Sequence, residues 1–78
     1  MKKILFADDE ESIRLLYQEE FEEAGYEVVV AASGEEALEK FAGTNPDLLV
    51  IDIKMPGMDG IEVLRRVREQ STDVPVIL

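Results

Sequence analysis

Three aspartates at the ends of two apolar runs are the residues of this sequence best placed to do chemistry. The run at residues 4–7 is followed by Asp8 and Asp9, and the run Leu48–Ile51 is followed by Asp52. If the two runs are neighbouring parallel strands, the three carboxylates meet at one edge of the sheet. Carboxylates in a partly dry site need a cation or a proton to hold them together. Without histidine or cysteine to favour zinc, an oxygen-seeking ion such as Mg²⁺ fits best.

Composition limits the size, compartment and partners of the protein. The 78 residues predict a single domain over 1–78, and a domain of this size buries only about 60% of its unfolded surface. The absence of cysteine is compatible with a reducing compartment, and we expect a cytoplasmic protein. A net charge of −10 makes nucleic acid and anionic lipid poor partners. No apolar run approaches the length of a membrane span, and the first run is too short for a signal peptide.

Strand-like and helix-like segments alternate along the chain. Strands are expected at Lys3–Ala7, 26–30, Leu48–Ile51 and 74–78, and helices at about 10–24, 33–43 and 60–69. Gly25 is expected to end the first helix, and the unbroken apolar run Leu48–Ile51 predicts a strand covered on both faces of the sheet. This β-α-β-α-β-α-β order predicts an α/β fold with a parallel sheet and right-handed crossovers. Ligands of such sheets bind beyond the carboxyl ends of the strands, which is where the three aspartates lie.

Each expected helix has a predicted start or a predicted inner face. The second helix begins with a capping box of Ser33 and Glu36, and Asp59 is expected to cap the third. A buried stripe is expected on the first helix at Ile13, Leu16, Tyr17, Phe21 and Ala24. The inner positions expected on the other helices are Ala37, Leu38, Phe41, Ile61, Leu64 and Val67. A solvated face is expected at Arg65, Arg66 and Arg68, with kinase docking as the alternative.

Two stretches of the sequence resemble the receiver domain of two-component response regulators. They are KILFADDE at residues 3–10 and PDLLVIDIKMPGMDG at 46–60. The pattern D-x-x-M-P-x-x-D-G directly after a buried strand is highly specific for this family. The resemblance implies a flavodoxin-like (CheY-like) parallel sheet and the function of a phosphoacceptor in a phosphorelay.

The resemblance also implies a role for each site residue. Asp52 would accept a phosphoryl group from a sensor histidine kinase. Asp9 directly, and Asp8 through water, would hold Mg²⁺ together with Asp52 and the backbone carbonyl of Lys54. The Lys54 side chain would tune the lifetime of the phosphoaspartate. Such a domain is not an enzyme with a separate substrate, since it catalyses only its own phosphorylation and dephosphorylation.

Receivers of this family have five strands and five helices, whereas the sequence ends in its fourth expected strand. The resemblance therefore implies the N-terminal part of a receiver, with any output domain outside the chain. The serine or threonine expected just after Leu78 and the lysine of the fifth strand are not in the sequence. An open fourth strand and an uncovered sheet face predict a homodimer or higher oligomer.

Other interpretations of the same residues remain open. Asp9 could cap the first helix, and Asp52 could be an ordinary loop acid. A second function is a fragment that binds Mg²⁺ and self-associates without efficient phosphotransfer. A third is an aspartate-nucleophile phosphatase, which typically has a second aspartate two residues after the nucleophile. That position is Lys54, which weighs against a phosphatase.

Overall fold

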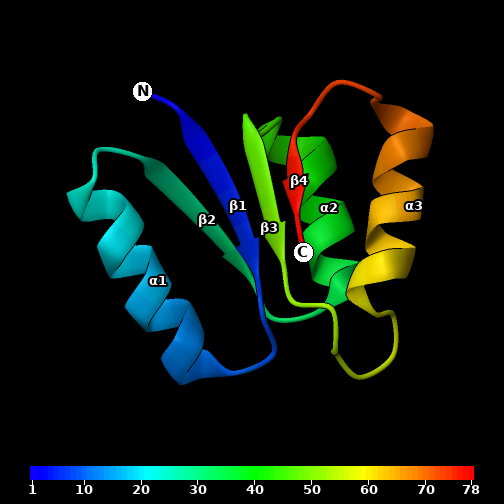
Figure 1. Cartoon of the computed structure of the whole chain (residues 1–78), viewed down its shortest axis with the longest axis horizontal. Coiled ribbons are helices and arrows are strands. Elements are labelled where there is room, and N and C mark those ends of the chain that lie inside the picture. The colour runs from blue at the N-terminus through cyan, green and yellow to red at the C-terminus, as the bar shows by residue number, and fades with distance from the viewer.

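Four parallel strands form the centre of the molecule, described over all 78 residues by a computed structural model (Figure 1). The strands are β1 (Lys3–Ala7), β2 (Glu27–Ala31), β3 (Leu48–Ile51) and β4 (Val76–Ile77), in the spatial order β2-β1-β3-β4. Every neighbouring pair is parallel. The predicted alternation and parallel sheet are thus confirmed, and β1 and β3 are neighbours as the convergence of the aspartates requires.

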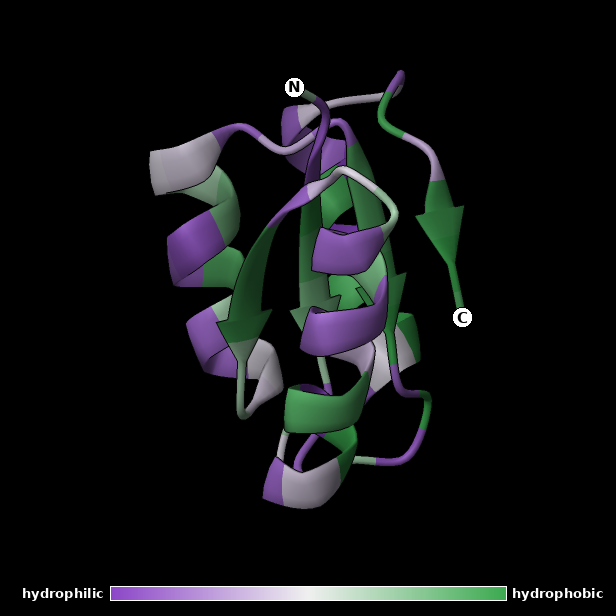
Figure 2. Cartoon of the chain, turned by 90° about the vertical axis from the view of Figure 1, so that its left-hand side faces the viewer, coloured by the Kyte–Doolittle hydropathy of each residue, from purple (hydrophilic) through white to green (hydrophobic).

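Three helices cover the two faces of the sheet unequally. They are α1 (Glu11–Glu23), α2 (Gly34–Thr44) and α3 (Gly60–Gln70). Helix α1 packs against β1 and β2 on one face, while α2 and α3 lie together on the other (Figure 1). Hydrophobic residues run along the strands, while the helices carry both hydrophobic and hydrophilic residues (Figure 2). None of the helices combines the length and the hydropathy that a membrane span requires.

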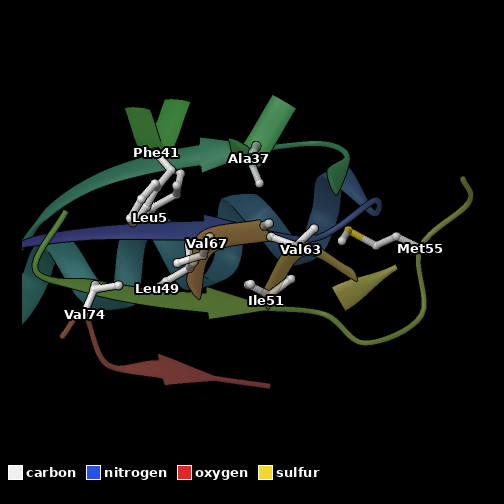
Figure 3. Packing of buried hydrophobic residues seen from close by; sticks show 11 residues of the cluster. Leu5, Ala37, Phe41, Leu49, Ile51, Met55, Val63, Val67 and Val74 are labelled. Carbon is white, nitrogen blue, oxygen red and sulfur yellow. The ribbon is translucent and has the colours of Figure 1, made fainter. Parts of the chain in front are cut away.

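The main core lies between the sheet and the α2–α3 layer (Figure 3). Successive side chains of a strand point to opposite faces, so alternate residues of β1 and β3 enter this core. Its members include Leu5, Ala7, Leu49, Ile51, Phe41, Val63 and Val67. Val63 and Val67 of α3 are fully buried, which fastens the start of this helix beside the end of β3.

On the opposite face, α1 covers β1 and β2 but not β3. Phe6 lies under α1, with its ring centroid 5.2 Å from that of Tyr17 and 6.1 Å from that of Phe21. Leu48 and Val50 of β3 are only half-buried, so the prediction that this strand is covered on both faces is wrong. The reason is that α1 lies over β1 and β2.

The predicted stripe of α1 is also only partly buried. Ile13 and Phe21 are half-buried, but Leu16 and Tyr17 remain 50% and 42% exposed, and no residue of α1 is fully buried. Ala24, placed on the same stripe, is exposed. A single helix on this face has no neighbouring helix to bury its flanks.

Two predictions about α3 are wrong. Ile61 is 46% exposed, whereas Val63 is fully buried, because the inward face of the helix follows Gly60, Val63 and Val67. Arg68 is not simply a solvated residue, since its guanidinium donates to the carbonyl oxygen of Val74 at 2.7 Å. It thereby ties the end of α3 to the segment that leads into β4.

Strands β1 and β3 have the expected bounds, and the ends of the other elements differ from the expected ones by at most two residues. Gly25, at φ 98°, ends the first helical segment as predicted, and β2 begins at Glu27 rather than at Tyr26. Glycine adopts a positive φ without steric cost, so it suits the sharp turn between α1 and β2. Only Val76–Ile77 form β4, where five residues were expected.

Helix capping is largely as predicted. Ser33 Oγ accepts from the Glu36 N–H at 3.1 Å, and Asp59 Oδ1 accepts from the Glu62 N–H at 2.9 Å. The reciprocal bond of the capping box is displaced by one residue, because Glu36 Oε1 accepts from the Ala32 N–H at 2.6 Å rather than from that of Ser33. The bond from the Ala32 N–H and the ion pair with Lys40, at 3.2 Å, both stabilise the ionised carboxylate. They therefore hold the pKa of Glu36 below its ordinary value.

Candidate functional site

The ends of β1 and β3 place the aspartates side by side. In the register of these strands Ala7 is paired with Ile51, so Asp8 and Asp52 leave the sheet at the same level. The ladder extends beyond the strands, because the Asp8 N–H donates to the Ala31 carbonyl at 3.1 Å and the Asp52 N–H to the Ala7 carbonyl at 2.9 Å. The backbones that carry both carboxylates are therefore held by the sheet itself.

The three carboxylates converge as predicted. One oxygen from each of Asp8, Asp9 and Asp52 lies within 4.8 Å of the others. Asp8 and Asp52 are half-buried and Asp9 is exposed. Helix α1 is preceded by Glu10 without a side-chain cap, so Asp9 does not serve as the N-cap. None of the four ion pairs of the structure involves these aspartates.

This donor set fits a small hard cation. Mg²⁺ binds oxygen at about 2.0–2.1 Å in an octahedron, so opposite ligands lie about 4.2 Å apart. Neighbouring ligands of the octahedron lie about 2.9 Å apart. The aspartate oxygens, which lie within 4.8 Å of one another, would have to draw together around a shared ion. Two acids that bind directly or through water, completed by backbone oxygen and solvent, match the preference of Mg²⁺ for keeping several waters.

Local hydrogen bonds orient two of the carboxylates. Asp8 Oδ1 accepts from the Glu10 N–H at 2.9 Å, and Asp52 Oδ1 accepts from the Lys54 N–H at 3.3 Å. Each of these bonds uses only one oxygen of the carboxylate, so the second oxygen is available to a ligand. The Lys54 side chain is exposed on the loop after Asp52. Its roles as carbonyl ligand and lifetime determinant stay predictions.

Two further residues shape the site and were missed from the sequence. A Cβ atom added to Gly60 would lie 2.5 Å from the Asp52 carbonyl oxygen and 2.9 Å from the Ile53 Cα, so only glycine allows α3 to start so close to the acceptor strand. Arg14 of α1 donates from its guanidinium to the Asp8 carbonyl oxygen at 2.8 Å. Neither contact has a local sequence signal, since both join segments whose approach depends on the fold.

An apolar cavity adjoins the carboxylates on the α1 face. It has a volume of about 250 Å³ and is lined by Asp8 and Asp52 together with Phe6, Ile13, Tyr17, Phe21, Val50 and Ile51. It lies where α1 leaves β3 uncovered.

The sequence and the fold of this chain were compared with those of known proteins, and many are similar to it. Residues 4–78 match the family model described as the response regulator receiver domain. The alkaline phosphatase synthesis transcriptional regulatory protein PhoP of Bacillus subtilis is 48% identical over 77 residues, which are 99% of this chain and 32% of PhoP. Sporulation initiation phosphotransferase F of the same organism is 43% identical, and the match covers 99% of this chain and 62% of that protein. The chain thus spans about a third to three fifths of these relatives.

Solved structures agree with the sequence comparison. The response regulator TrrA of Thermotoga maritima in complex with Mg²⁺–BeF is 50% identical, with a TM-score of 0.96 over 100% of this chain and 68% of that one. A crystal structure of the histidine kinase ThkA in complex with TrrA matches at 49% identity, with a TM-score of 0.91 over 97% of this chain and 66% of that one. The predicted flavodoxin-like fold is confirmed.

Proposed function

Because this chain belongs to the response regulator receiver domain family, a class of signalling modules of two-component systems, we propose that Asp52 accepts a phosphoryl group in a Mg²⁺-dependent step. The observation that carries the proposal is the convergence of the Asp8, Asp9 and Asp52 carboxylate oxygens within 4.8 Å. Mg²⁺–BeF in the complex of the similar regulator TrrA supports a magnesium site in a fold of this kind.

The proposed step is a transfer from phosphohistidine to aspartate. A carboxylate oxygen of Asp52 forms a bond to phosphorus, the phosphorus–nitrogen bond breaks, and its electron pair returns to the imidazole ring, which takes up a proton. Bound Mg²⁺ would supply charge neutralisation between the anionic nucleophile and the anionic phosphoryl group. The chain's own contribution is to hold Asp52 by its backbone and to keep one carboxylate oxygen without an intramolecular partner.

The remaining site residues act on the cation and on the lifetime of the product. We assign the metal to Asp9, Asp8, Asp52 and the Lys54 carbonyl, and the tuning of phosphoaspartate lifetime to the Lys54 side chain. Asp9 is the exposed one of the three aspartates, so its carboxylate is open to a hydrated cation. The domain would catalyse only its own phosphorylation and dephosphorylation.

A sensor histidine kinase is the proposed donor, and an output domain beyond this segment is the proposed receiver of the signal. The complex of ThkA with TrrA supports the first assignment, and the description of PhoP as a transcriptional regulatory protein supports the second. We propose the cytoplasm as the compartment of the working protein, because a kinase and an output domain would reach it there.

The test uses acetyl phosphate with Mg²⁺ and reads the intact mass of the chain. We expect one phosphoryl adduct that is absent with EDTA and absent in Asp52→Asn. Asp73→Asn, at an exposed loop residue, is the matched control and should form the adduct normally. An adduct that persists in Asp52→Asn would disprove the assignment of the acceptor.

A second function, binding Mg²⁺ and self-associating without efficient transfer, is favoured by the exposed edge strand. Ile77 and Leu78 are 55% and 44% exposed on and after β4, and the apolar cavity lies on the same face as Val50. Edges and apolar patches of this kind promote pairing. Light scattering at micromolar concentration should then give the mass of a dimer, and a compact monomer would contradict self-association. Mg²⁺ binding without any phosphoryl adduct would leave only this second function.

A further inference from the structure

The contact between Arg14 and Asp8 is made to the backbone that carries two of the three clustered aspartates. The Arg14 guanidinium donates to the Asp8 carbonyl oxygen at 2.8 Å in a partly buried position. This oxygen belongs to the peptide unit that joins Asp8 to Asp9. A peptide unit is planar, so fixing its oxygen also fixes the direction in which the Asp9 backbone leaves it. One side chain of α1 therefore constrains the link between the two acids.

Two other polar groups of Asp8 are also held. Its N–H donates to the Ala31 carbonyl at 3.1 Å, and its Oδ1 accepts from the Glu10 N–H at 2.9 Å. Asp8 is thus tied to β2 through Ala31, to the start of α1 through Glu10, and to the side chain of Arg14. The Asp52 backbone is held separately by β1. Arg14 is the contact whose loss would free the Asp8–Asp9 link without breaking the sheet.

The charge of Arg14 opposes its effect as a hydrogen-bond donor. A positive charge that contacts the Asp8 backbone repels a divalent cation bound nearby, so removing the charge alone should strengthen Mg²⁺ binding. Positioning and electrostatics thus predict changes of opposite sign for the same substitution.

We propose that Arg14 is a positioning residue for the metal site, holding the Asp8–Asp9 peptide so that both carboxylates face Asp52. The proposal rests on the function proposed above. Groups that orient metal ligands typically change metal affinity by 10–100-fold when they are removed. Arg14 acts through the backbone of a ligand and does not touch the cation.

Three variants separate positioning from charge. Arg14→Met removes the donor and the charge, and Arg14→Lys keeps the charge and a donor. Arg65→Met is the matched control, because it removes the same charge from a side chain that is 70% exposed and paired only with Glu62. Mg²⁺ affinity is measured from amide NMR shifts near Asp9 and Asp52, and urea unfolding is measured alongside to identify variants that merely lose stability.

We expect Arg14→Met to bind Mg²⁺ about tenfold more weakly, Arg14→Lys to recover most of the affinity, and Arg65→Met to bind as tightly as the parent or slightly more tightly. Unchanged or tighter binding by Arg14→Met would overturn the proposal, because only the charge effect would then remain.

A metal-free measurement keeps this test distinct from that of the proposed function. Hydrogen exchange of the Glu10 amide, which donates to Asp8 Oδ1, should become about fivefold faster in Arg14→Met, as expected for the loss of one hydrogen bond. If the parent chain binds no Mg²⁺, the proposed function fails, and the exchange rate alone then decides the role of Arg14. Unchanged exchange would refute that role whether or not Mg²⁺ binds.

Discussion

Replacing Gly60 with alanine should damage both stability and the metal site, although alanine is the better helix former. The added Cβ would lie 2.5 Å from the Asp52 carbonyl oxygen, 2.9 Å from the Ile53 Cα and 3.1 Å from the Asp52 carbonyl carbon. All three are backbone atoms, so no side-chain rotation can relieve the contacts. Either α3 must move away from β3 or the backbone of the acceptor aspartate must shift.

The magnitude follows from two opposing effects. Forcing an extra carbon into a packed position costs about 1–3 kcal/mol, and the higher helix propensity of alanine returns at most about 1 kcal/mol. We expect a net loss of about 1–2 kcal/mol in the free energy of unfolding. This is a large share of the roughly 4–12 kcal/mol expected for a domain of this size.

Urea unfolding and Mg²⁺ titration together provide the assay. Gly43→Ala is the matched control, because a Cβ at Gly43 in α2 meets nothing within 4 Å. That variant should gain about 0.5–1 kcal/mol and bind Mg²⁺ as the parent does. Gly60→Ala should lose stability and bind Mg²⁺ more weakly. If the two alanine variants behaved alike, the inferred close approach of α3 to Asp52 would be wrong.

Three further predictions test other parts of the structure. Glu36→Gln should lower the stability by at most about 0.5 kcal/mol at neutral pH, because glutamine still accepts the Ala32 N–H and only the charge of a half-exposed side chain is lost; because the folded-state pKa of Glu36 lies below the ordinary 4.5, this contribution is lost as pH falls through that folded value, and urea unfolding from pH 7 to 3 should show the two proteins converging. Parallel loss of stability at every pH would contradict a contribution from the charge of Glu36. Asp9→Asn should raise the melting temperature in EDTA, because it relieves repulsion of at most about 1 kcal/mol among the three carboxylates. The same change should weaken Mg²⁺ binding, so calorimetry should show a higher melting temperature without Mg²⁺ and a smaller stabilisation when Mg²⁺ is added. Leu5→Ala should cost about 2–5 kcal/mol in urea unfolding, because the side chain is 0% exposed, and a smaller loss would mean that the core collapses around it.

The predictions that succeeded from the sequence depend on neighbours along the chain. Ser33 and Asp59 cap their helices because each side chain reaches an N–H three residues ahead, whatever the rest of the fold does. The glycine at 25 ends its helical segment for a similarly local reason. The family resemblance supplied the pairing of β1 with β3, which periodicity alone leaves open.

The failures occurred where a residue's surroundings are set by distant segments. Ile61 and Val63 fit a helix equally well, and only the place of α3 against the sheet decides that Val63 is the buried one. Val50 was expected to be covered on both faces, and the position of α1 leaves it half-buried. Helical or strand periodicity states which residues share a face, but it does not state what lies opposite that face.

By itself, the sequence determined the alternation of strands and helices, the capped helix starts and the presence of aspartates at two strand ends, because these depend on contacts a few residues apart. Tertiary structure alone decided how closely the carboxylates of Asp8, Asp9 and Asp52 approach, that Gly60 must lack a side chain, and that Arg14 reaches the Asp8 carbonyl. Each of these contacts joins segments that meet only when the sheet is assembled and the helices have packed onto it.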